Sequence, residues 1–518
     1  MNRKVRTAVA VALAIAVALW VRQRDRTDDA PKPATVAATP GAPVAPPKPI
    51  RRLGNLAFQP CTLSAPLGTA TVEAQCGTFE VPEDRGNPAG RRIRLAVAWL
   101  PASGEAMPDP VVMLAGGPGQ GALESFPQIA PAFAEVRKRR HILLVDQRGT
   151  GGSNPLMCRD KAGRSAVLEE DNDNLAQARA FAAKCAKSLA GKADPRFYTT
   201  GEAIDDLDAV RAAAGAPQLN LVGISYGTRV AQQYARRYPS RTRTLVLDGV
   251  APNTLVLGLD HAKNLEASLA LQFERCRRQP TCVGPLGDPR GQLNALLARV
   301  AAAPPLVRYR DGITGEAREE ALTRGHIAML ARMFAYAPQV AGLLPLELHE
   351  AMAGRYESLM ALSKLVTGTM GDSIMHGMQL SVMCAEDVDE FRVDPADEGS
   401  LLGNEMITFL QAQCTAWPRG KRDPAFRKPL DGDTPVLLLS GEFDPVTPPR
   451  YGEEVVKTLP RGRHLVVRGQ GHNTLPVGCV PKLFANFVDT ADAKALDVEC
   501  LEQVPYAQPF TGFHGWDP

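Results

Sequence analysis

Short apolar runs, each ending in a turn, alternate with segments of helical spacing in two parts of this sequence. A continuous apolar run is typical of a strand that is buried on both faces. Alternation of such strands with helices predicts an α/β fold, in which a mostly parallel sheet carries helices on both faces. The apolar runs occupy residues 93–100, 111–114, 142–145, 219–224, 244–247, 435–439 and 464–467, and helical spacing occupies residues 203–214 and 226–238.

Between the two parts, the short apolar runs that predict strands are absent and long helical patterns take their place. These patterns cover residues 261–276, 291–302, 324–334 and 346–365. We therefore predict that residues 51–251 and 421–518 build one sheet domain, and that residues 252–420 form a large helical insertion in it. An insertion at this place should lie over the carboxyl edge of the sheet and cap whatever site is there.

The N-terminus has the pattern of an export signal. Three basic residues among the first six precede an uncharged stretch, residues 7–21, made mostly of Ala, Val and Leu. Its length fits a signal peptide and is short for a membrane span, which needs about 20 residues. We predict a signal peptide or N-terminal membrane anchor at residues 1–28 and a Pro/Ala-rich linker at residues 29–50. This predicts export to the periplasm or the cell exterior; a buried core helix is the alternative.

Ten cysteines are spread along the chain without a C-x-x-C pair. A zinc site would cluster them, whereas an even number of dispersed cysteines in an exported chain favours five disulfides. The sequence does not fix the connectivity. We predict pairing between sequence neighbours, because each such pair brackets a short segment; buried free thiols are the alternative. The cysteines are Cys61, Cys76, Cys158, Cys185, Cys276, Cys282, Cys384, Cys414, Cys479 and Cys500.

Charge and composition exclude several classes of protein. The net charge is +3, and charges of both signs are mixed along the chain, so no basic stripe suggests a nucleic-acid partner. The sequence has no Gly-rich phosphate loop and no cluster of metal-ligand residues, so we expect no cofactor. Membrane contact is expected only through the N-terminal segment.

Residues 223–227 read Gly-Ile-Ser-Tyr-Gly and lie between a predicted strand and a predicted helix. G-x-S-x-G in that setting is the nucleophile elbow, a sharp turn that lifts the Ser hydroxyl above the sheet and points a helix N-terminus at the reacting centre. The pattern alone is common, and a chance match in a turn is the alternative. Its setting makes Ser225 the predicted nucleophile.

A neutral serine needs a base, and the base needs an acid that orients it. In this fold the order along the chain is Ser, acid, His. Asp444 follows the next-to-last predicted strand and is the predicted acid, with Glu442 as its competitor. His472 lies in a loop of small residues after the last predicted strand and is the predicted base.

The oxyanion of an acyl-transfer intermediate needs two N–H donors. One should be the backbone N–H of Tyr226, the residue after the nucleophile. The other should come from the Gly-Gly-Pro-Gly loop at residues 116–119, where we choose Gly117, with Gly116 as the alternative. A tight turn without function is the plain alternative for that loop.

Three motifs in combination point to a known group. They are Gly-Gly-Pro-Gly at residues 116–119, Asp-Gln-Arg-Gly-Thr-Gly-Gly-Ser at residues 146–153 and the elbow at residues 223–227. Together they resemble the proline iminopeptidase and tripeptidyl aminopeptidase group of serine peptidases, which have the α/β-hydrolase fold. The part from residue 384 to His472 is similar to the C-terminal region of secreted tripeptidyl aminopeptidases. Ala115 stands where proline iminopeptidases usually carry His, which favours the secreted subgroup.

The resemblance, which spans roughly residues 56–510, implies a serine exopeptidase that removes one or a few residues from the free N-terminus of short peptides. Such an enzyme needs a carboxylate for the substrate ammonium group, and Glu386 is our candidate, with Asp387 second. A surface role for both acids is the alternative. A bond between Cys384 and Cys414 would brace the loop that presents Glu386. A carboxylic-ester hydrolase with the same triad, and a binding protein on an inactive hydrolase scaffold, are the competing functions.

Overall fold

The computed structural model describes residues 49–65, 68, 70–158, 174–312 and 314–515. The predicted signal or anchor segment lies outside these residues, as does the predicted linker up to residue 48. From Pro49 onward the chain forms one compact unit. In the described part of the chain, no helix is long and apolar enough to span a membrane.

A ten-stranded sheet organises the structure, in the order β1-β2-β3-β4-β6-β5-β7-β8-β11-β12. From β6 to β12 in that order all neighbours are parallel, whereas β1 to β4 form an antiparallel extension that joins β6 through β4. The mostly parallel sheet predicted from the sequence is therefore confirmed. The strands are β1 (Arg51–Leu53), β2 (Leu56–Ser64), β3 (Thr71–Pro82), β4 (Arg92–Leu100), β5 (Val111–Leu114), β6 (Ile142–Val145), β7 (Leu219–Ile224), β8 (Thr242–Asp248), β11 (Val436–Gly441) and β12 (Gly462–Val467).

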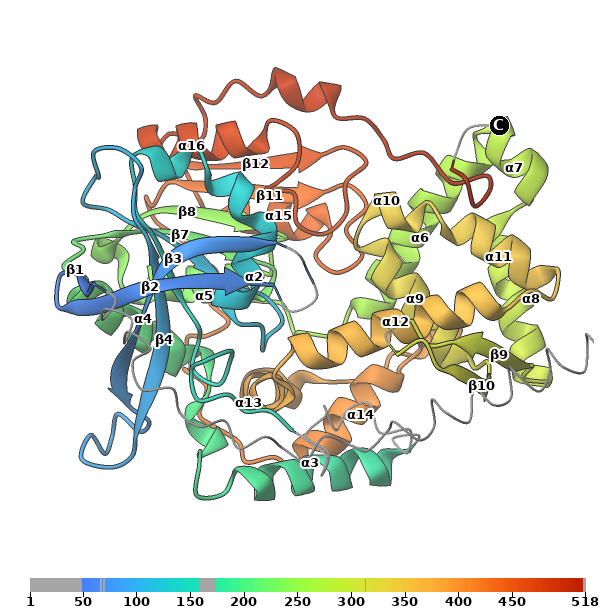
Figure 1. The fold of residues 1–518 in the computed structure, drawn as a ribbon, viewed down its shortest axis with the longest axis horizontal. Coiled ribbons are helices and arrows are strands. Elements are labelled where there is room, and N and C mark those ends of the chain that lie inside the picture. Colours follow the sequence, from blue (N-terminus) through green and yellow to red (C-terminus); the bar gives the residue numbers. More distant parts are fainter. Residues whose placement is uncertain (1–48, 66–67, 69, 159–173, 313, 516–518) are drawn as a thin grey trace, which may run out of the picture. The chain divides into compact units, whose positions relative to one another are not determined.

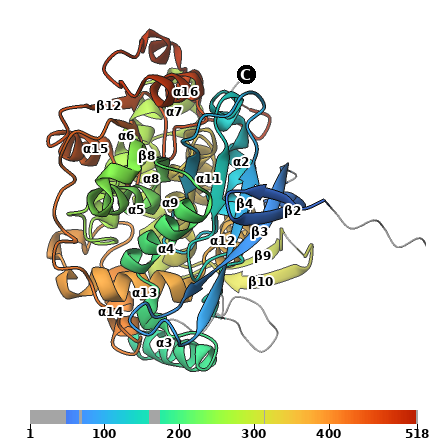
Figure 2. The ribbon, with the colours of Figure 1, turned by 90° about the vertical axis from the view of Figure 1, so that its left-hand side faces the viewer.

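Alternate side chains of the parallel strands pack into two cores on opposite faces of the sheet, as the two-residue period of a strand requires. On β7, Leu221 belongs to one core and Val222 to the other. The first core packs against α4 (Thr200–Ala213) and α5 (Tyr226–Arg237), which lie side by side (Figure 2). The second packs against α2 (Ala122–Ile129) and α16 (Val480–Thr490). Two covered faces explain why these strands read as continuous apolar runs.

Helices dominate the segment between β8 and β11 and surround a core of their own, for example Leu269, Leu296 and Phe334 (Figure 1). A two-stranded hairpin, β9 (Leu306–Arg310) with β10 (Ala317–Ala321), interrupts them. The helices are α6 (His261–Arg277), α7 (Pro280–Leu286), α8 (Pro289–Ala302), α9 (Arg324–Ala335), α10 (Pro338–Ala341), α11 (Leu344–Met352), α12 (Glu357–Ser373), α13 (His376–Glu386) and α14 (Glu405–Cys414).

One helix prediction in this segment is wrong. The helical pattern over residues 346–365 is divided between α11 and α12, because the chain turns at Gly354. Gly354 has φ +85°, a left-handed conformation that ends helices and that glycine adopts without steric cost.

Five disulfides join the ten cysteines, and every one connects sequence neighbours, as predicted. Cys384–Cys414 ties the end of α13 to the end of α14, next to Glu386. No cysteine is left free. Five disulfides are typical of a protein that folds in an oxidising compartment, and so they support export. The bonds are Cys61–Cys76, Cys158–Cys185, Cys276–Cys282, Cys384–Cys414 and Cys479–Cys500.

Candidate active site

Ser225 occupies the turn between β7 and α5 in a conformation that L-residues rarely adopt, with φ 56° and ψ −123°. The turn is held by the Ser225 N–H, which donates to the Asp248 carbonyl at 2.9 Å. A Cβ on Gly223 would lie 2.4 Å from the Gly227 carbonyl oxygen, and one on Gly227 would lie 2.1 Å from that of Leu114. Both flanking glycines are therefore required by close backbone packing around the elbow.

Asp444 and His472 meet at the carboxyl edge of the sheet. The His472 Nδ1 lies 2.8 Å from Asp444 Oδ2. The other carboxylate oxygen of Asp444 accepts the N–H groups of Val446 and Thr447, each at 2.8 Å, which fixes the side chain. Glu442, the competing acid, instead accepts the N–H of Gly469 at 2.7 Å. The structure thus brings Asp444, and not Glu442, to the imidazole.

The electrostatics of this pair suit a general base. Burial pulls the pKa of His472 down, but the charge and hydrogen bond of Asp444, together with the charge of Asp248, outweigh it and raise the pKa above 6.5. Burial alone would raise the pKa of Asp444, but the His472 ring and two backbone N–H groups lower it overall. Asp444 therefore stays ionised and holds the histidine with Nδ1 as donor, which leaves Nε2 free to accept a proton.

The Gly-Gly-Pro-Gly loop after β5 packs directly against the elbow. A Cβ on Gly116 would lie 3.0 Å from the Ser225 Cβ, so a larger residue there would crowd the nucleophile. Gly117 lines the cavity beside Ser225, and Tyr226 begins α5, so its N–H is one of the unpaired donors of a helix N-terminus. Both predicted oxyanion donors are therefore next to Ser225.

A cavity of about 380 Å³ opens above these groups, a size within the usual range for small-ligand sites. Ser225 and His472 line it together with residues of the helical segment, among them His261 and Tyr336. The Tyr336 carbonyl accepts the His472 N–H at 2.8 Å, and the two rings meet edge to face with centroids 5.2 Å apart. The helical segment therefore covers the site and supports the base directly.

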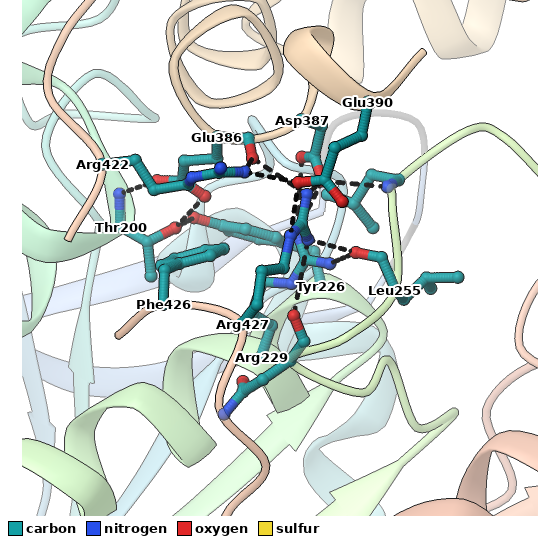
Figure 3. Close-up of polar contacts among 12 residues, drawn as sticks. Thr200, Tyr226, Arg229, Leu255, Glu386, Asp387, Glu390, Arg422, Phe426 and Arg427 are labelled. Carbon is teal, nitrogen blue, oxygen red and sulfur yellow. Dashed lines mark hydrogen bonds and ion pairs between the residues drawn. The ribbon is translucent and has the colours of Figure 1, made fainter. Parts of the chain in front are cut away.

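Glu386 is the last residue of α13 and Asp387 follows it, and both contact residues of α4 or α5. Figure 3 shows both within a network of polar contacts around α4 and α5, and neither lines the cavity beside Ser225. The Glu386 carboxylate accepts the N–H and the hydroxyl of Thr200 at 2.7 and 2.9 Å. Thr200 Oγ1 lies 2.6 Å from the hydroxyl of Tyr226. Glu386 thus caps α4 and is linked to Tyr226 of the elbow through Thr200.

Asp387 is enclosed by cations. Its carboxylate pairs with Arg229 of α5 at 3.3 Å and with Arg427 at 2.8 Å, and it accepts the Leu257 N–H at 3.1 Å. The side chains of Asp387 and Arg229 are fully buried. Burial first, and then the charge of Asp387, raise the pKa of Glu386 to about 7. The surface alternative for these acids is wrong, and their role in binding an ammonium group stays a prediction.

Sequence reasoning missed the residues that the helical segment contributes to the cavity. His261, Arg332 and Tyr336 all line it. Burial, and then the charges of Arg332 and His472, lower the pKa of His261 to about 3, so it is neutral. Each of these residues lies in or at the end of a helix whose spacing resembles an ordinary amphipathic pattern, and the sequence carries no local signal that would distinguish them.

Comparison with known proteins agrees with this geometry. Residues 109–279 match the family described as alpha/beta hydrolase fold, and residues 399–500 match the family described as TAP-like protein. The serine protease Hip1 of Mycobacterium tuberculosis is 25% identical over 468 residues, covering 81% of this chain and 85% of the relative. Tripeptidyl aminopeptidase of Streptomyces lividans is 26% identical over 475 residues, 84% of each chain. Carboxylesterase B of M. tuberculosis is 28% identical over 461 residues, 81% of this chain and 84% of the relative.

The chain is therefore a serine hydrolase with the α/β-hydrolase fold. Its C-terminal TAP-like region and its relatives among the serine peptidases confirm the resemblance to the tripeptidyl aminopeptidase group inferred from the motifs.

Proposed function

We propose that this protein is a serine exopeptidase that removes one or a few residues from the free N-terminus of short peptides through an acyl-enzyme. The observation that carries the proposal is an Asp444–His472 pair at 2.8 Å whose histidine lines the same covered cavity as the elbow serine. The relative named tripeptidyl aminopeptidase, aligned over 84% of each chain, supports peptides as the substrates.

The proposed mechanism follows from the placement of each group. His472 Nε2 takes the proton of the Ser225 hydroxyl while Oγ attacks the scissile carbonyl, and Asp444 stabilises the imidazolium. The N–H groups of Tyr226 and Gly117 bind the oxyanion. Collapse of the intermediate expels the amine, which takes the proton from His472. A water molecule, deprotonated by the same histidine, then hydrolyses the acyl-enzyme and regenerates Ser225.

The covered cavity supports short peptides over folded proteins as substrates. Its volume of about 380 Å³ accommodates a few residues, and the helical segment closes over the base through Tyr336. In this proposal the side-chain carbonyls of Gln120 and Gln379, which line the cavity, offer acceptors to the substrate ammonium group.

A carboxylic-ester hydrolase is the second candidate. The relative named carboxylesterase B favours it, as does the apolar part of the cavity wall, which includes Leu255, Leu257 and Met383. Ester and amide cleavage share the acyl-enzyme route, so the triad does not separate them. Measured activity on matched peptide and ester substrates separates the two candidates.

The test compares an unmodified tetrapeptide, its N-acetyl derivative and a 4-nitrophenyl ester of a short fatty acid. We expect the free peptide to lose residues from its N-terminus, with products identified by mass spectrometry, and the acetylated peptide to be cleaved at least tenfold more slowly. Efficient cleavage of the acetylated peptide would overturn the exopeptidase proposal, and turnover of the ester alone would establish the second candidate.

Replacement of Glu386 by Gln tests its predicted role in ammonium binding. Because the carboxylate is bonded to Thr200 outside the cavity, we expect kcat/KM to fall by the same small factor on the free tetrapeptide and on the ester. A selective loss on the free peptide of roughly 10- to 150-fold, the value of one charge-assisted hydrogen bond, would instead assign Glu386 to the ammonium group. Glu390→Gln, which changes an acid of the same network, is the matched control.

A further inference from the structure

Arg332 on α9 is a cation that faces the cavity without a carboxylate partner. It is partly buried and lines the cavity with Ser225 and His472. Its Nη1 donates a hydrogen bond to the thioether sulfur of Met406 at 3.4 Å. Among the described side chains, no Asp or Glu forms an ion pair with its guanidinium. None of the described side chains therefore neutralises the positive charge at this place.

The remainder of the described cavity wall does not offset this charge. None of the lining residues that the structure describes is an Asp or a Glu. Asp444 lies behind His472 and its oxygens are taken by the imidazole, the Thr447 hydroxyl and two backbone N–H groups. Arg332 also helps to keep His261 neutral. The cavity thus carries a fixed positive charge on its helical side and a histidine base on its sheet side.

A guanidinium in this state is a binding group for an anion. It has five N–H donors in a planar fork that matches a carboxylate, whereas a thioether is a weak acceptor and engages only one of them. A charge that is partly removed from water and lacks a partner gains most from a ligand of opposite sign.

Arg332 lies on α9 close to a residue that contacts His472, and this places its charge near the scissile bond of a bound substrate. Tyr336 follows one helical turn later, roughly 6 Å along the helix axis, and its ring packs against His472. A short peptide whose scissile carbonyl is at Ser225 is therefore long enough to reach the guanidinium of Arg332.

We propose that Arg332 binds a carboxylate of the substrate, so that the preferred substrates are short peptides that carry a negative charge a few bonds from the scissile carbonyl. The carboxylate comes either from the C-terminus of the peptide or from an acidic side chain. The inference rests on the proposed action of Ser225 as nucleophile and names the chemical class of substrate that the site prefers.

Two esters with the same leaving group test it without requiring peptide cleavage. 4-Nitrophenyl hydrogen adipate and 4-nitrophenyl hexanoate have acyl chains of six carbons and differ in the terminal carboxylate. We expect Arg332→Gln to lower kcat/KM on the adipate ester by roughly 10- to 150-fold and on the hexanoate ester by only a few-fold. Arg278→Gln, which changes an exposed cation on the same segment, should leave both values unchanged.

Equal losses on the two esters, or no loss on either, would overturn the role of Arg332. Because the esters report on Arg332 even if no peptide is cleaved, failure of the peptidase proposal is distinguished from failure of this one.

The source of the carboxylate is identified by calorimetry, which measures how tightly tripeptides bind to the Ser225→Ala protein. If amidation of the C-terminus weakens binding of a tripeptide, the bound carboxylate is the C-terminus. If an acidic residue placed in the amidated tripeptide restores binding, the bound carboxylate is a side chain. Equal affinity for all of these tripeptides, whether or not they are amidated or carry an acidic residue, would contradict the proposal.

Discussion

Ser225→Ala is expected to abolish turnover of every substrate while the fold stays intact. Loss of a triad nucleophile costs about 10⁶-fold in kcat in a well-studied serine peptidase, because no other group forms the acyl-enzyme. The Ser225 side chain does not cap α5, and alanine tolerates the elbow φ as well as serine does, so stability should change by less than about 0.5 kcal/mol.

Thermal unfolding and steady-state kinetics on the same preparation check both parts of this expectation. Ser188→Ala, on the exposed side of α3 (Leu175–Leu189), is the matched control and should retain full activity. Residual activity of the Ser225→Ala protein above a few per cent, with an unchanged unfolding temperature, would remove Ser225 from the role of nucleophile.

Asp444→Asn is expected to have the second largest effect, a loss of roughly 10⁴-fold in kcat, as for the corresponding change in a well-studied triad. An asparagine cannot stabilise the imidazolium or hold Nδ1 as the donor. Glu442→Gln should cost only a few-fold, because Glu442 contacts the Gly469 backbone and not the histidine. The reverse order of effects, measured by steady-state kinetics, would make Glu442 the triad acid.

The same variant should change the pH profile in a defined direction. His472 must be neutral to act as base, so activity rises with pH as the imidazole loses its proton. Asp444 raises the pKa of His472 above 6.5, so the wild-type rise should be centred above pH 6.5. Without that carboxylate burial dominates and lowers the pKa, so the rise in Asp444→Asn should move to lower pH. A shift to higher pH would contradict this account of the pair.

Local sequence signals were sufficient for the parallel strands of the sheet and for the three side chains of the proposed triad. Strands such as β7 and β11 are buried on both faces, so their apolar runs stand out, and Ser225 and Asp444 lie at or just after the ends of these two strands. His472 lies in the loop after β12, which is partly exposed. The steric requirement for glycine at 223 and 227 left a pattern that sequence alone reveals. Sequential disulfides were predictable because each closes a short loop.

The missed features depend on long-range packing. The antiparallel strands β1 to β3 are partly exposed, and their mixed pattern did not stand out. Which face of α9 meets the cavity depends on how the helical segment packs on the sheet, so Arg332 carried no signal in the sequence. Glu386 was placed by resemblance, and its bonds to Thr200, which lies 186 residues earlier, arise only in the folded chain.

The most direct test of the central claim is covalent labelling of the wild-type protein with a fluorophosphonate, followed by peptide mapping. This reagent phosphonylates a serine that a neighbouring base activates. We expect one adduct per chain, located on Ser225, with labelling slowed by a short peptide that has a free N-terminus and labelling largely lost in Asp444→Asn. A folded protein that takes up no label, or takes it up at another serine, would contradict the assignment of Ser225, Asp444 and His472 as the catalytic triad.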